Sequence, residues 1–172
     1  MSPLHWLDRL AAGAASKPAV YEPIFRDGWG DSDLLAYLEE QSGYAGPIAD
    51  IDISWSYSEF SDGAFVRDGT FASPEVDLLP QASGVAHVRE VSPLGQARAS
   101  VVVMAAFNDH GYETRTRLAT LLARKGIASV MLENPDYGRR RSDPGQPIRT
   151  VTDVFAMGSA AVSEGRSLLK WL

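Results

Sequence analysis

The sequence predicts an α/β fold in which antiparallel strands lead into a parallel sheet built from a βαβα unit. Residues 54–91 contain three segments with strand character, two of them joined by a short Gly-containing loop at 61–63. Residues 99–107 and 127–132 contain continuous apolar runs, which are typical of strands buried on both faces of a sheet. A helical pattern separates these runs, and a crossover of this size is what a parallel strand pair needs.

The leading region, residues 1–53, is expected to form a helical preface. Short helices are expected at 4–15 and 32–42, with Ser32 as the amino-terminal cap of the second helix and Gly43 where it ends.

The second region, residues 54–172, is expected to hold the sheet and two further helices. Its strands are expected at 54–60, 64–71, 85–91, 99–107 and 127–132. One helix is expected at 112–125, with three leucines on one face (Leu118, Leu121 and Leu122). The last helix follows a capping-box pattern formed by Thr150 and Asp153 and runs to Leu172. A final helix without a following strand predicts an incomplete sheet.

The composition is typical of globular proteins and argues against binding to nucleic acid. With 172 residues, 45% hydrophobic and 22% charged, it fits one domain with a real core. The net charge of -6 divides into -9 over residues 1–100 and +3 over 101–172, so a continuous basic face for nucleic acid is not expected. No apolar run is long enough to predict a transmembrane segment. The absence of cysteine and of a signal-like leader favours a cytoplasmic location.

The first candidate site is the turn after the 99–107 strand, formed by Asn108, Asp109, His110 and Gly111. Open α/β sheets place ligands at the carboxyl ends of their strands, where this turn is expected to lie. The alternative is that Asn, Asp and Gly make a tight strand-to-helix turn with no further role.

The second candidate site follows the 127–132 strand and is expected on the same rim of the sheet. Glu133 and Asn134 could line a pocket, Tyr137 could supply an aromatic wall, and Gly138 could fix the loop. The following arginines, 139–141, are expected to form a solvated basic loop.

These motifs resemble the abhydrolase domain-containing protein 18 family of α/β-hydrolases. The resemblance rests on Asn-Asp-His-Gly at 108–111, on Leu-Glu-Asn-Pro-Asp-Tyr-Gly-Arg at 132–139 and on Asp-Val-Phe-Ala-Met-Gly at 153–158. It implies the amino-terminal part of an α/β-hydrolase sheet, an esterase- or lipase-like serine mechanism on a small-molecule ester, and an oxyanion-hole role for the 108–111 turn.

The residues that would complete such a mechanism are not found in the sequence. No serine stands in Gly-x-Ser-x-Gly, and the later acid and histidine of the family pattern are also missing. His5, His87 and His110 stand in the preface, a strand and the candidate turn, so no catalytic residue is assigned. The turn lacks Gly-x-Gly-x-x-Gly for a dinucleotide, and no ligand set converges for a metal, so no cofactor is expected.

Three interpretations remain at this point: an incomplete serine hydrolase that is inactive alone, a Rossmann-like binding module, and a subunit completed by a partner. In the resembled fold the 101–107 strand lies beside the strand that carries the nucleophile. Without that strand, 101–107 is expected to become an edge through which the chain self-associates.

Overall fold

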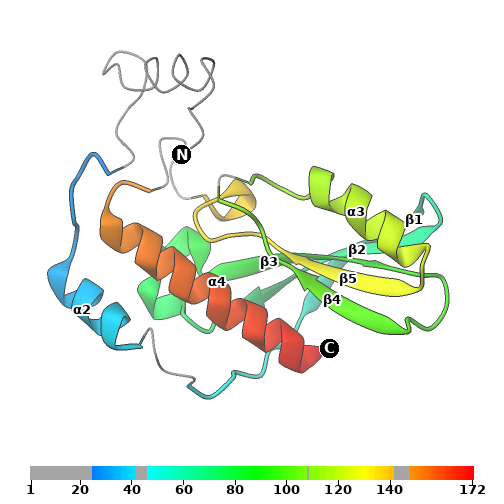
Figure 1. Cartoon of the computed structure of the whole chain (residues 1–172), viewed down its shortest axis with the longest axis horizontal. Helices are drawn as coiled ribbons and strands as arrows, with labels where there is room; N and C mark the ends of the chain where they lie inside the picture. The colour runs from blue at the N-terminus through cyan, green and yellow to red at the C-terminus, as the bar shows by residue number, and fades with distance from the viewer. Residues whose placement is uncertain (1–24, 42–45, 108, 142–147) are drawn as a thin grey trace, which may run out of the picture.

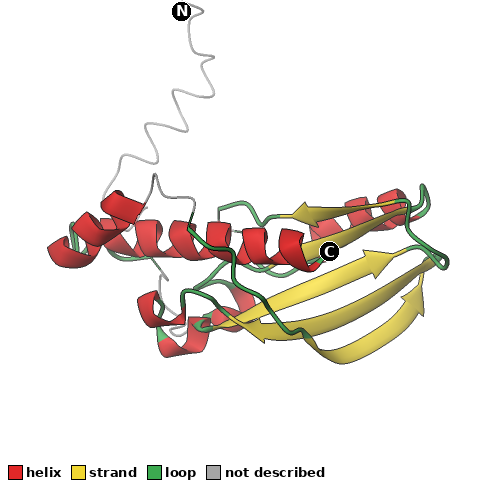
Figure 2. Ribbon diagram, turned by 90° about the horizontal axis from the view of Figure 1, so that it is seen from below, coloured by secondary structure: helices red, strands yellow, loops and turns green. Residues whose placement is uncertain are grey.

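The computed structural model describes residues 25–41, 46–107, 109–141 and 148–172, which form a twisted five-stranded sheet with helices packed on it (Figures 1 and 2). The expected helix at 4–15 and Gly43 lie outside the described residues. The strands lie in the order β1-β2-β3-β5-β4. Their bounds are Ser54–Ser61 for β1, Ala64–Ala72 for β2, Val85–Ser92 for β3, Ala99–Val103 for β4 and Ile127–Leu132 for β5.

The sheet is mixed, as the hydrophobic patterns predicted. β4 and β5 are parallel, with Val101 opposite Ser129, while the other three neighbouring pairs are antiparallel. The β1–β2 hairpin turns at Asp62 and Gly63, whose φ angles of 53° and 80° belong to the left-handed region that tight hairpin turns require.

Two helices cover opposite faces of the sheet. α3 (Glu113–Ala123) packs Ala119 and Ala123 against Met131 of β5 and Val91 of β3. α4 (Val151–Trp171) packs Leu168 on the other face, among the residues Val88, Val130, Leu132 and Phe71. The alternation of β5 side chains explains this division, because successive residues point to opposite faces.

The described part of the preface packs against α4. α2 (Ser32–Gln41) lies beside α4, and the N–H of Thr152 donates to the carbonyl of Trp29 at 3.1 Å. The predicted cap of α2 was wrong by one residue: Asp31, not Ser32, accepts from the N–H groups of Asp33 and Leu34, at 2.9 and 3.0 Å. A carboxylate satisfies two of the unpaired amides at once.

The expected burial of β4 was wrong. The strand ends at Val103, and Val101 to Val103 are only partly buried, since β4 lies at the edge of the sheet with β5 as its one strand neighbour among the described residues. The edge position itself was expected for this strand, and the strand order of the described residues confirms it. An edge strand has a neighbour on one side only, so its side chains are less covered than those of a central strand.

The expected apolar face of α3 was also wrong. Leu118 and Leu121 are exposed, and the buried side of the helix consists of Arg115, Ala119 and Ala123. Small residues allow the helix to approach the sheet closely, and Arg115 is buried because the carbonyl groups at the strand ends bind it.

The prediction that the arginines at 139–141 form a solvated loop fails at Arg140. Its guanidinium is fully buried and binds both carboxylate oxygens of Glu164 on α4, at 2.7 and 2.8 Å. It also donates to the carbonyls of Ser83 and Glu133, at 2.6 and 2.8 Å for the shortest contacts. The ion pair therefore ties the loop after β5 to α4 and to the segment before β3.

Within the described residues, no helix combines the length and the apolar character that crossing a bilayer requires.

Replacing Arg140 by Met should lower the free energy of unfolding by roughly 3–5 kcal/mol, because it leaves the Glu164 carboxylate buried without its partner. Lys170→Met, on the helix that carries Glu164, is the control, since the Lys170–Asp50 pair is exposed and should contribute less than about 1 kcal/mol. The double variant Arg140→Met, Glu164→Leu should recover most of the loss. Urea denaturation measures all three, and equal effects for the two single variants would contradict a structural role for the buried pair.

Candidate functional site

The two candidate turns lie in contact at the carboxyl ends of the parallel strands β4 and β5. The side-chain amide of Asn134 donates to the carbonyl of Ala106 at 3.1 Å, just ahead of the first turn. The ring of Tyr137 lies 5.1 Å from His110 and 6.1 Å from Phe107, measured between centroids. Asn134 and Tyr137 therefore connect the two turns. Both side chains are buried and do not lie on the exposed rim of the sheet.

Arg115 holds the first turn and both strand ends together. Its guanidinium donates to the carbonyls of Leu132 at 2.6 Å, Gly111 at 2.7 Å and Val103 at 3.2 Å. Its Nε lies 2.8 Å from a carboxylate oxygen of Asp109. The sequence analysis missed Arg115, because a helical arginine beside leucines is normally assigned to a solvated face.

The first turn exposes His110 and adopts a left-handed backbone at Gly111, where φ is 73°. That conformation costs glycine little and allows the chain to turn sharply from β4 into α3. The amide of Asp109 donates to the carbonyl of Ala106 at 3.1 Å, which closes the turn. Asn108, the fourth predicted residue of this turn, lies outside the described residues.

Glu133 and Gly138 fix each other in the second turn. A Cβ at Gly138 would lie 1.7 Å from Oε1 of Glu133, and φ at Gly138 is 51°, so glycine is required there on both counts. The same Oε1 accepts the N–H of Arg139 at 3.2 Å. Burial raises the pKa of Glu133, although the Arg139 N–H and the nearby guanidinium groups act in the opposite direction.

Asp136 is a buried acid of the second turn that the sequence analysis did not single out. It has a left-handed backbone, with φ of 64°, and its carboxylate accepts the hydroxyl of Ser83 at 2.6 Å. Burial raises its pKa, with the Ser83 hydrogen bond acting against the shift. Because Ser83 also accepts the amide of Asp136 at 3.0 Å, the loop is anchored to the segment before β3.

A cavity of about 330 Å³ opens beside the two turns. Its lining combines both turns with Arg89 of β3: Arg89, His110, Gly111, Tyr112, Glu113, Glu133, Gly138 and Arg139. It brings together His110, Gly111, Glu133 and Gly138 of the predicted site residues.

Charged groups at this cavity are largely paired. Arg89 binds Asp68 through two hydrogen bonds, at 2.6 and 2.9 Å, and Arg139 lies 3.4 Å from the same carboxylate. Burial alone would raise the pKa of Asp68, but Arg89 and then Arg139 lower it overall. Burial raises the pKa of the Tyr112 phenol, with the neighbouring Glu133 acting in the same direction.

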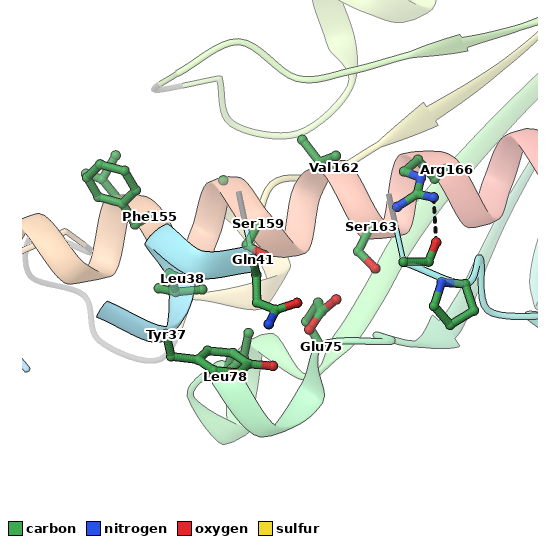
Figure 3. A pocket seen from close by; sticks show the side chains of 14 residues that line it. Tyr37, Leu38, Gln41, Glu75, Leu78, Phe155, Ser159, Val162, Ser163 and Arg166 are labelled. Atoms are coloured by element: carbon green, nitrogen blue, oxygen red, sulfur yellow. Dashed lines mark hydrogen bonds between the residues drawn. The ribbon is translucent and has the colours of Figure 1, made fainter. Parts of the chain in front are cut away.

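A second cavity, of about 540 Å³, lies between α2 and α4, away from both turns (Figure 3). Ser159 and Ser163 of α4 line it, and Arg166 of the same helix donates to the carbonyl of Gly46 at 2.8 Å. Ser159, which follows a glycine in the sequence, is therefore a helical residue rather than part of a nucleophile turn.

His87 is the other histidine among the described residues. His87 lies in β3, where burial and then the charges of Arg139 and Arg140 lower its pKa. In the part of the chain that the structure describes, no three His, Asp or Glu side chains are grouped to hold a metal ion.

The sequence of residues 22–172 matches the family described as alpha/beta hydrolase domain containing 18.

Three solved structures that align with parts of this chain are named as esterases. A candidate acetyl xylan esterase from Bacteroides fragilis aligns over 81% of this chain and 41% of its own, with a TM-score of 0.51 and 14% identity, which shows a shared fold. A cold-adapted esterase from an Arctic intertidal metagenomic library aligns over 49% and 34%, with a TM-score of 0.42 and 19% identity. A glucuronoyl esterase from Teredinibacter turnerae aligns over 94% and 48%, with a TM-score of 0.38 and 14% identity. The chain thus spans less than half the length of each.

Replacing Gly138 by Ala should lower the free energy of unfolding by roughly 2–4 kcal/mol, because the methyl group needs a strained backbone and collides with Glu133. Gly95→Ala is the control, since a Cβ there meets nothing within 4 Å, and it should change stability by less than about 0.5 kcal/mol. Adding Glu133→Ala to Gly138→Ala should cost less than the sum of the two single effects. Additive losses would mean that the two residues do not constrain each other.

Proposed function

Because the chain belongs to the alpha/beta hydrolase domain containing 18 family, we propose that residues 54–172 form the amino-terminal part of a serine hydrolase domain that cleaves carboxylic esters. The observation that carries this proposal is the joining of the 109–111 turn to the loop after β5, at the carboxyl ends of parallel strands. This edge is where α/β folds place their ligands. The esterase names of the solved structures favour an ester as the substrate.

In this proposal the first turn supplies the oxyanion hole. Attack on an ester carbonyl turns its oxygen into an oxyanion, which preorganised backbone N–H groups stabilise. The Asp109 amide is used by the carbonyl of Ala106, so we assign the donor role to the next amides, those of His110 and Gly111. Arg115 acts as a positioning residue, because it holds the Gly111 carbonyl and the Asp109 carboxylate and thereby orients the turn. A contribution from Asn108 remains a prediction.

The nucleophile and the general base must come from outside these 172 residues, since the sequence contains no Gly-x-Ser-x-Gly. Binding and oxyanion stabilisation alone give slow catalysis at best. The chain by itself is therefore proposed to be inactive. Two alternatives share the same geometry: a binding module that uses the rim without catalysis, and a subunit that receives the nucleophile from a partner.

The 172-residue chain should hydrolyse p-nitrophenyl acetate at the background rate and should not react with a serine-directed fluorophosphonate. The physical reason is that no serine of the sequence stands in the Gly-x-Ser-x-Gly pattern of a nucleophile turn. The absorbance of released p-nitrophenol measures hydrolysis, and in-gel fluorescence measures labelling. Ser159→Ala on α4 is the matched control, and it should behave as the unchanged chain does in both assays. Saturable hydrolysis accompanied by stoichiometric labelling of the chain would contradict the assignment of the nucleophile to residues outside it.

We further propose that the chain self-associates through the open edge of β4. The strand is apolar and uncharged from Val101 to Val103, and its unpaired side offers N–H and C=O groups to a second strand. A stripe on α4 adds apolar surface, because Phe155, Val162 and Leu169 follow at intervals of seven residues and are 50%, 61% and 62% exposed. Removing each of these side chains from water contributes roughly 1.5–3 kcal/mol, so pairing with a second copy is favoured.

A lysine on β4 should reduce this self-association. Ser100 is exposed, so Ser100→Lys places a charge on the open strand without removing a core contact. Ser58→Lys on β1, also exposed and at the other edge of the sheet, is the control and should leave association unchanged. Light scattering over a dilution series measures the apparent mass. An equal effect of both variants, or a wild-type chain that stays monomeric at high concentration, would rule out the β4 edge as the interface.

A further inference from the structure

Three buried residues meet at the hydroxyl group of Ser83, in the segment before β3. Its Oγ lies 2.6 Å from Oδ1 of Asp136, 2.8 Å from the carbonyl oxygen of Arg140 and 3.0 Å from the amide nitrogen of Asp136. Ser83 and Arg140 are fully buried, and Asp136 is 6% exposed. These groups are removed from bulk water, so each short contact has to be explained by a hydrogen bond within the protein.

The contacts need more protons than the serine can supply. The amide of Asp136 donates to Oγ, whereas the carbonyl of Arg140 and an ionised carboxylate can only accept. A hydroxyl group has one proton, so Ser83 cannot make a full hydrogen bond both to Oδ1 and to the carbonyl. With Asp136 ionised, one of these two contacts would place oxygen lone pairs against each other.

A proton on Oδ1 of Asp136 removes this conflict. Asp136 then donates to Oγ of Ser83, and Ser83 donates to the carbonyl of Arg140. Oγ accepts two hydrogen bonds, from the carboxyl group and from the amide of Asp136, which matches its two lone pairs. Each of the three short contacts then joins one donor to one acceptor.

The charges that act on Asp136 are compatible with a neutral carboxyl group. The positive charge of Arg140 is compensated by Glu164 on α4, whose two carboxylate oxygens both bind it. The carboxylate of Asp153, also on α4, disfavours a second negative charge nearby. Burial raises the pKa of Asp136 and Asp153 acts in the same direction, whereas a hydrogen bond from Ser83 and the charge of Arg140 act against them.

We propose that the folded chain holds a proton on Asp136 as an anchor, which ties the loop after β5 to the segment before β3 through Ser83. Loss of this proton to solvent breaks one hydrogen bond of the chain from Asp136 to the Arg140 carbonyl and loosens the loop. Because the loop also carries Glu133, Gly138 and Arg139, the shape of the cavity that these residues line depends on the proton. The anchor is independent of the proposed hydrolase function, since it uses only the described residues.

NMR of the side-chain carboxyl carbon of Asp136 in the ¹³C,¹⁵N-labelled chain tests the proton directly. Its titration midpoint is expected above that of an unperturbed aspartic acid, about 3.9. The protection of the Asp136 amide against hydrogen exchange, corrected for its intrinsic pH dependence, should fall over the same pH range, because this amide donates to Ser83. A midpoint at or below 3.9 would overturn the proton assignment, and constant protection across the titration would overturn the anchor.

Asp136→Asn supplies a neutral amide that can donate to Ser83 and that tolerates the left-handed backbone of this position. A raised pKa in the folded state gives Asp136 a stabilising contribution that is complete below about pH 4 and is lost as the pH rises through the folded pKa. The urea midpoint of the variant relative to that of the unchanged chain should therefore rise between about pH 4 and about pH 8. Comparing the two proteins at each pH cancels the other titrating groups.

Asp62→Asn is the matched control. Asp62 also has a left-handed backbone, with φ of 53°, but it is exposed in the β1–β2 turn, so its relative urea midpoint should not change between the two pH values. A relative midpoint of Asp136→Asn that falls as the pH rises would show an ionised, stabilising carboxylate and would overturn the proposal. Equal behaviour of the two variants would do the same, because it would assign the effect to asparagine in a left-handed backbone.

Discussion

The buried ion pair between Arg140 and Glu164 is the interaction on which the arrangement of the candidate site depends. Moving two charges out of water is costly, and the pair offsets that cost only because both guanidinium and carboxylate find further or bidentate partners. Because each buried charge must keep its hydrogen bonds, the two side chains can adopt only one relative arrangement. The loop that follows β5 is therefore held at a fixed position relative to α4, and Glu133, whose carbonyl also binds Arg140, begins that loop.

Arg115 fixes the position of the 109–111 turn, as Arg140 fixes the position of the loop after β5. The carbonyl groups at the carboxyl ends of β4 and β5 converge where the strands stop pairing, and a planar guanidinium can bind several of them at once. Arg115 thus binds the last carbonyl groups of β4 and β5, and Arg140 binds the carbonyl of Glu133 directly after β5. Two turns that are 20 or more residues apart in sequence become one rigid surface for this reason.

Much of the fold was predictable from hydrophobic periodicity, because alternation and apolar runs follow directly from which faces are buried. The parallel β4–β5 pair, the β1–β2 hairpin and the Thr150–Asp153 capping box of α4 all follow local rules. Burial of individual residues was less predictable. Arg115 and Arg140 are buried by partners distant in sequence, and Leu118 lies on the exposed side of α3 because alanines, not leucines, fit against the sheet.

The site shows the same division between local and distant causes. A glycine after a strand predicts a sharp turn, and Gly111 and Gly138 indeed adopt left-handed backbones. The sequence does not reveal why position 138 must be glycine. The cause is the carboxylate of Glu133, which occupies the space that a side chain at this position would need. The same packing leaves the other carboxylate oxygen of Glu133, Oε2, buried and without a hydrogen-bond partner among the described residues. The rigidity of this loop therefore has its physical origin in the crowding of a buried acid against a residue without a side chain.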